Sequence, residues 1–174
     1  MSFKLLKLFL ISLVVSCSTS KTSLLISDTY NKNENKTTLN LVPYGTIEMP
    51  GEWTKTTYNE ISRQHFFVDS DSTTIAVTKN PQNNYPFYSD KMTNAEFTRE
   101  FFEWEKQYYE DKGYEIEEKS VDNNFIIWTV VGKNTNTTFL YGAKHKFAFN
   151  FAIFTDNWSR DKQFEFLHLL FDKN

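Results

Sequence analysis

The side chains that most often perform catalysis or bind metal ions are sparse in this sequence. The three histidines, His65, His145 and His168, stand 80 and 23 positions apart, and this spacing does not predict a metal-ligand set. The five glycines are isolated and form neither a phosphate-binding loop nor the Gly-x-Ser-x-Gly turn of a serine hydrolase. We therefore predict no cofactor, no metal site and no catalytic residue.

Paired acids are the remaining candidates for acid–base chemistry. Glu115, Glu117 and Glu118 have the pattern of the solvated face of an edge strand, and Asp69 and Asp71 have that of turn-forming residues. These patterns favour a structural role over a catalytic one.

Aromatic residues indicate a binding surface instead. They make up 17% of the chain, and Tyr85, Phe87 and Tyr88 crowd into one loop between polar residues. If exposed, this loop would mark a partner or ligand site; alternatively, it covers the mouth of the core. Phe102 and Tyr109 lie about 100° from the main aromatic stripe of the following helix and either extend this surface or widen the buried face.

The only cysteine ends an N-terminal segment with the features of an export signal. Two lysines in Met1–Lys7 precede the apolar run Leu8–Val15, which is much shorter than the roughly 20 residues that span a bilayer. Val14-Val15-Ser16-Cys17 resembles the lipobox of bacterial lipoproteins. The resemblance implies that residues 1–16 are a signal peptide and that Cys17 carries lipid, including palmitate. An ordinary cleaved signal and an uncleaved anchor are the alternatives.

Charge argues against a nucleic-acid partner. The formal net charge is -3, and removing residues 1–16 takes away Lys4 and Lys7 and no acid, which lowers it to -5. Binding to a phosphate backbone needs clustered Lys and Arg. The one local basic cluster, Lys144-His145-Lys146, has the composition of a polar turn.

The polar composition of residues 17–40 predicts a flexible tether between the lipid and a single globular domain, residues 41–174. About 23 such residues would typically span near 26 Å. The apolar residues Leu24–Ile26 could instead dock on the domain.

The predicted elements of the domain are strands and two helices. Thr93-x-x-Glu96 is a capping box that begins a helix ending near Gly113, with Phe97, Phe101, Trp104 and Tyr108 in one stripe. A second helix is predicted over Trp158–Asp172, capped by Asp156 or Asn157, with its core face at Phe164, Leu167, Leu170 and Phe171. The predicted strands are Thr46–Met49, Glu60–Val68, Thr73–Thr78, Tyr114–Val121, Phe125–Val131 (placed centrally), Thr137–Gly142 and Lys146–Thr155.

The order of these elements predicts an α+β fold in which an antiparallel sheet of about six strands packs against two amphipathic helices. Gly45–Trp53, with its short strand, Pro50-Gly51 turn and Trp53, resembles the opening of PsbP/Mog-type domains. That resemblance implies a PsbP/Mog-like sandwich over residues 40–174 and an accessory or binding role.

Three classes of function remain open. The first is a lipid-anchored, non-catalytic binding or accessory protein of a bacterial cell envelope, on the periplasmic face of either membrane in a Gram-negative cell, with an envelope protein as its partner. The second is an envelope enzyme of hydrolase type, which would need histidines and an acid in one pocket. A carrier of a small apolar ligand is a further alternative, and it would need a large aromatic-lined cavity.

Overall fold

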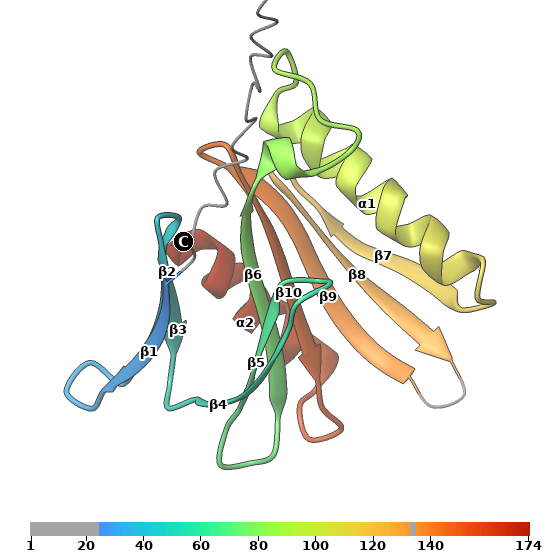
Figure 1. Cartoon of the computed structure of the whole chain (residues 1–174). Helices are drawn as coiled ribbons and strands as arrows, with labels where there is room; N and C mark the ends of the chain where they lie inside the picture. The colour runs from blue at the N-terminus through green and yellow to red at the C-terminus, as the bar shows by residue number, and fades with distance from the viewer. Residues whose placement is uncertain (1–24, 133–134) are drawn as a thin grey trace, which may run out of the picture.

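The computed structural model describes residues 25–132 and 135–174 (Figure 1). The predicted signal peptide, Cys17 and the residues up to position 24 lie outside the described part of the chain. The predictions of cleavage and lipidation therefore stay predictions.

Seven antiparallel strands form the main sheet, in the order β4-β5-β6-β10-β9-β8-β7 (Figure 1). The strands are β4 (Thr54–Asn59), β5 (Gln64–Val68), β6 (Thr74–Pro81), β7 (Glu115–Val121), β8 (Phe125–Gly132), β9 (Thr135–Lys144) and β10 (Phe147–Phe154). The prediction of an antiparallel α+β sheet is confirmed, with one more strand than expected. The additional strand is β4, whose polar sequence shows no apolar alternation.

A second, three-stranded sheet precedes the main one and consists of β1 (Leu25–Asn31), β2 (Lys36–Val42) and β3 (Gly45–Pro50). In β2, alternate side chains at Thr37, Leu39 and Leu41 are buried, which is the period of a strand with one face on a core.

The prediction of a flexible tether over residues 17–40 is therefore wrong from residue 25 onward, and the domain does not begin at residue 41. In the strands up to residue 40, the Ser, Thr and Asn side chains other than the buried Thr37 lie at outward positions. Ile26 packs against the core, as the docking alternative required.

Two helices complete the fold. Helix α1 (Asn94–Glu110) begins with the predicted capping box, in which the Thr93 hydroxyl accepts from the Glu96 backbone N–H at 3.2 Å. Helix α2 (Arg160–Lys173) is capped by Ser159, so the prediction of Asp156 or Asn157 as its cap is wrong. Leu167, Leu170 and Phe171 form its buried face, as predicted, with Phe164 partly buried beside them.

The two faces of the main sheet carry separate cores. The small sheet and α2 cover one face, where Phe149, Phe151 and Ile153 of β10 point. Helix α1 covers the other face, where Ala148 and Ala152 leave room for close packing. Because α1 lies mainly over β7, β8 and β9, the same face of β4, β5 and β6 has no helix above it (Figure 1). This asymmetry leaves part of the sheet face uncovered beside α1, and the candidate site lies there.

β8 is an interior strand, but the central position predicted for it belongs to β10. β8 has buried side chains on both faces because α1 and α2 lie on opposite sides of it. The edge position predicted for the acidic strand is confirmed, because β7 ends the sheet and its Glu115, Glu117 and Glu118 are exposed.

Candidate functional site

The predicted aromatic loop packs onto α1. Tyr85, Phe87 and Tyr88 are each partly buried, with Tyr85 centred 4.7 Å from the Phe101 ring and Phe87 centred 5.2 Å from the Phe97 ring. The loop is held at its base by Gln82, whose side-chain amide donates to Asn94 Oδ1 at 3.0 Å. The loop therefore covers the end of the core, which was the alternative interpretation.

Phe102 is not part of an exposed surface, and its prediction as a binding residue is wrong. Its side chain is fully buried and lies edge-on to Trp128, at 5.4 Å between ring centroids. Tyr109 is partly buried among Trp128, Phe139 and Tyr114. Both residues widen the buried face of α1.

The aromatic stripe predicted for α1 is only half buried. Phe97 and Phe101 face the sheet, whereas Trp104 is 48% exposed and Tyr108 is 56% exposed. The helix rests on the sheet through Thr98 and Phe102 in place of these two residues. Trp104 is thereby left beside the uncovered part of the sheet.

A pocket of about 220 Å³ opens at this position, and we call it the Glu105 pocket. Its wall comes from α1 and the aromatic loop, its floor from the central strands and its rim from the β4–β5 turn. The residues that line it are Ile61, Ser62, Arg63, Thr78, Asn80, Asn84, Tyr85, Pro86, Phe101, Trp104, Glu105 and Asn150.

The strand register places polar side chains in a row on this face of the sheet, and two of them, Thr78 and Asn150, line the floor of the pocket. Asn150 of β10 lies directly between its cross-strand partners, Thr78 of β6 and Tyr141 of β9. The Thr78 hydroxyl donates to the Arg63 carbonyl at 3.3 Å and so ties the β4–β5 turn to the floor. Neighbouring β-strands carry opposed side chains on the same face, so this row follows from the register alone.

Asn150 leaves a polar atom unpaired on this floor. The residue is 8% exposed, and its side-chain carbonyl oxygen is buried without a hydrogen-bond partner. A buried acceptor without a donor costs about 1–3 kcal/mol. A ligand that donates a hydrogen bond to this oxygen would remove that cost.

Glu105 contributes a carboxyl group that is mostly buried. Burial raises its pKa to about 7, and a hydrogen bond with Tyr141 offsets part of the rise. No salt bridge joins Glu105 to a cation within the described residues. Near neutral pH the group is therefore present in both the protonated and the ionised form.

Two phenols complete the polar set. Burial raises the pKa of Tyr85 to about 12, an effect that a hydrogen bond with Asn80 partly offsets, and burial also raises the pKa of Tyr141. Both hydroxyls therefore stay protonated at physiological pH, and each can donate as well as accept.

This arrangement is suited to binding by hydrogen bonds. Its residues include no Cys, His or Lys, and Glu105 is its only carboxylate. His65 lies on the opposite face of the sheet, stacked on Tyr58 at 4.5 Å between ring centroids, and His145 lies in the exposed β9–β10 turn. The histidines and acid that the hydrolase alternative requires therefore do not lie in one pocket.

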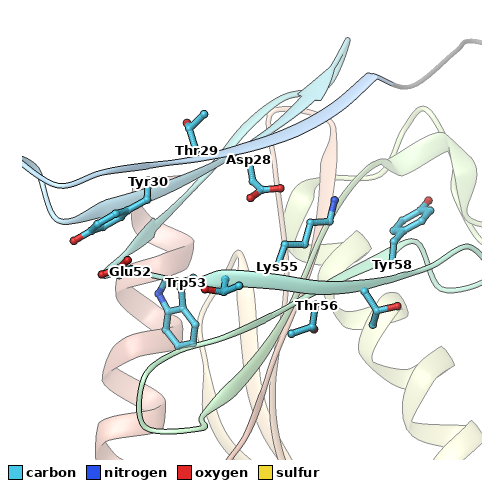
Figure 2. Close-up of a pocket in the computed structure, with 10 residues that line it drawn as sticks. Asp28, Thr29, Tyr30, Glu52, Trp53, Lys55, Thr56 and Tyr58 are labelled. Carbon is cyan, nitrogen blue, oxygen red and sulfur yellow. The ribbon is translucent and has the colours of Figure 1, made fainter.

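A second, larger groove of about 580 Å³ separates two sheet edges (Figure 2). Strand β1 is an edge of the small sheet and β4 an edge of the main sheet, and Asp28 and Lys55 point into the groove from opposite sides. The buried polar atoms without a partner in the described part of the chain include none from this groove. We therefore regard the Glu105 pocket as the stronger candidate.

Across residues 25–132 and 135–174, no three side chains of His, Cys, Asp or Glu gather closely enough to hold a metal ion. None of the described helices has the length and apolarity needed to cross a bilayer.

Comparison with known proteins adds one similarity of fold. No family model and no curated protein matches the chain. Among solved structures, the chain is similar to the solution structure of cyanobacterial PsbP (CyanoP) from Synechocystis sp. PCC 6803, with a TM-score of 0.42 and 11% identity over 90% of this chain and 93% of that one.

The sequence interpretation missed Glu105 and Asn150. Glu105 follows Trp104 on the predicted helix, and no local pattern distinguishes it from the other acids of that helix. Asn150 carried the stronger signal, because it is the only strongly polar residue in the otherwise apolar strand Phe147–Phe154. Burial of an amide in a central strand carries a cost that usually requires a partner.

Proposed function

We propose that this protein is a lipid-anchored, non-catalytic binding protein of a bacterial cell envelope and that it binds a small polar ligand in the Glu105 pocket. The anchor would be Cys17, on the basis of the lipobox-like sequence before it. The single observation that supports the binding role is the buried, unpaired carbonyl of Asn150 on the floor of an open pocket.

The character of the pocket favours a polar ligand over an apolar one. An apolar carrier would have a large aromatic-lined cavity, whereas amides, a hydroxyl and a carboxyl line this floor. Within the described residues, the two cores lie on separate faces of the sheet and are filled with aromatic and aliphatic side chains.

Replacing Asn150→Leu tests the binding role. Leucine has nearly the same volume and no unpaired acceptor, so the variant should be as stable as the wild type or more stable, whereas a structural role of the amide predicts a loss of stability. We expect this result together with the loss of ligand binding, because the amide supplies hydrogen bonds to the ligand.

Binding is measured through the indole N–H signal of Trp104 in nuclear magnetic resonance spectra, titrated with small neutral, cationic, anionic and zwitterionic molecules. If no probe shifts this signal in the wild type, or if every shift persists in Asn150→Leu, the proposed site is wrong.

Metabolic labelling with radioactive palmitate tests the anchor. We expect the wild type to be labelled and Cys17→Ser to be unlabelled and released from the membrane fraction. An unlabelled wild type would contradict the anchor without affecting the pocket.

A further inference from the structure

We infer that the ligand of the Glu105 pocket is a single sugar ring, a neutral molecule with several hydroxyl groups. This inference rests on the proposed binding role and adds the chemical class of the ligand. Three properties of the pocket support it: its size, the kind of hydrogen bonds it offers and its exposed aromatic wall.

The size of the pocket limits the ligand to about one ring. The volume of about 220 Å³ is below the roughly 300–1,000 Å³ of sites for drug-sized molecules. The rim residues Ile61, Ser62 and Arg63 belong to the β4–β5 turn and close the side opposite α1. A larger ligand would protrude past this turn into solvent.

The floor offers groups that both donate and accept hydrogen bonds. Asn80 and Asn150 each have this double capacity, and Glu105 shares it when protonated. A hydroxyl group also donates and accepts, so each hydroxyl of a sugar can satisfy one floor group in either direction. The unpaired carbonyl of Asn150 requires a donor, which a hydroxyl supplies without a charge.

The wall of the pocket is a positioned aromatic ring. Trp104 is half exposed, and its indole is held edge-on to Tyr85 at 6.1 Å and tilted against Phe87 at 5.9 Å between ring centroids. A sugar ring presents apolar C–H groups on its faces, and these gain contact with an aromatic face. Because the indole is already held by its neighbours, little ordering is required when the ligand binds.

The charges around the pocket do not favour an ion. Glu105 raises the pKa of Tyr85 and Arg63 lowers it, so both charges act on the Tyr85 hydroxyl. The titratable or charged groups that face Glu105 are Tyr141 of β9, Tyr85 of the loop and Tyr109 of its own helix, with Arg63 across the pocket. Arg63 would repel an ammonium ligand, and ionised Glu105 would repel a carboxylate ligand. A neutral ligand avoids the desolvation of a charge.

The test titrates the full chain with glucose, galactose and mannose at pH 6 and pH 8 while the Trp104 indole N–H signal is followed. Choline, acetate and glycine serve as cationic, anionic and zwitterionic probes of similar or smaller size. We expect at least one sugar to shift the signal with a millimolar dissociation constant and the three charged probes to leave it unchanged.

Three variants sharpen this result. Glu105→Gln keeps a neutral group that donates and accepts, so this variant should still bind the sugar, with the same affinity at pH 6 and at pH 8. Asn150→Leu and Trp104→Ala should each weaken sugar binding at least tenfold. Because Trp104→Ala has no indole, its binding is followed through the backbone amide signals of the residues that line the pocket. Glu103→Gln, on the exposed side of α1, is the matched control and should behave as the wild type.

The outcomes separate this inference from the proposed function. Choline binding that is lost in Glu105→Gln would show an ammonium site, and acetate binding lost in Arg63→Gln would show an anion site. Glycine binding that depends on both residues would show a zwitterion site. Each of these results overturns the sugar inference and leaves the binding role intact. If no probe binds in a manner that depends on Asn150, both fail.

Discussion

Replacing Glu105→Gln should make the stability of the protein less dependent on pH. The pKa of this carboxyl rises from its usual 4.5 to about 7 when the chain folds, chiefly because of burial. Between these two values the folded state binds more protons than the unfolded state, so the free energy of unfolding falls as pH rises from about 4.5 to about 7. Above that range the full cost of burying the ionised group is present.

The size of the effect follows from the same two values. The rise in pKa corresponds to about 3 kcal/mol, because a tenfold change in proton affinity is worth about 1.4 kcal/mol. Since Glu105 keeps some contact with solvent, we take this figure as an upper bound. We therefore expect Glu105→Gln to match the wild type near pH 4.5 and to exceed its stability by up to about 3 kcal/mol at pH 8.

Urea unfolding at half-unit steps from pH 4.5 to pH 8.5 measures this difference. The control is Glu103→Gln, whose side chain is 48% exposed and lies near Arg99 and Lys106, and its difference from the wild type should not follow the same curve. A constant difference between wild type and Glu105→Gln across this range would refute a buried, uncompensated carboxyl at this position.

Three further changes test other parts of the fold. Burial and Lys55 lower the pKa of His65 to about 4, so the unfolded chain takes up the proton first, and the wild type should lose at most about 3 kcal/mol of stability as pH falls from 6.5 through about 4. His65→Phe should not show this loss. Urea unfolding of both proteins between pH 7 and pH 4 measures the difference, and identical pH dependence would contradict the prediction. Thr93→Ala should lower the free energy of unfolding by about 1 kcal/mol through loss of the capping box, whereas an unchanged urea midpoint would show that the cap contributes nothing. Gly142→Ala should lower the free energy of unfolding by about 1–3 kcal/mol, because a β-carbon there would lie 2.5 Å from Phe171 Cε2 and 2.8 Å from the Asn124 carbonyl oxygen. An unchanged thermal unfolding temperature would show that these neighbours move aside without loss of stability.

The sequence predicted those elements that carry strong local signals. The capping box placed the start of α1 within one residue and Gly113 placed its end within three residues of the observed limits, and the alternation of Phe and small residues identified β10 and its two faces. In both segments, local preference and burial agree, which is why the prediction succeeded.

The strands β1, β2 and β4 were missed because their sequences resemble linkers. They are rich in Ser, Thr, Asn and Lys, and only a few inward positions such as Leu39 and Leu41 contact the core. Their strand structure depends on pairing with the neighbouring strand and on packing of that hairpin against the core, which the polar pattern of each segment does not contain.

The Glu105 pocket also could not be predicted from the sequence, because its residues are brought together by the topology of the sheet. Its residues come from the β4–β5 turn, β6, the loop before α1, α1 itself and β10, and these meet only after the strand order of the sheet is fixed. The exposure of Trp104 depends on the angular setting of α1 on the sheet, which Thr98 and Phe102 determine.

The early start of β1 has a consequence for the geometry that the proposed lipid anchor would give the protein. Since Leu25 already belongs to a strand, only residues 18–24 separate Cys17 from the folded body, in place of a connection reaching to residue 40. Seven residues reach at most about 25 Å even when fully stretched. With lipid on Cys17, the end of the domain that carries Leu25 would stay within that distance of the headgroups, and whatever it captures would be held close to the bilayer rather than sampled deep in the surrounding compartment.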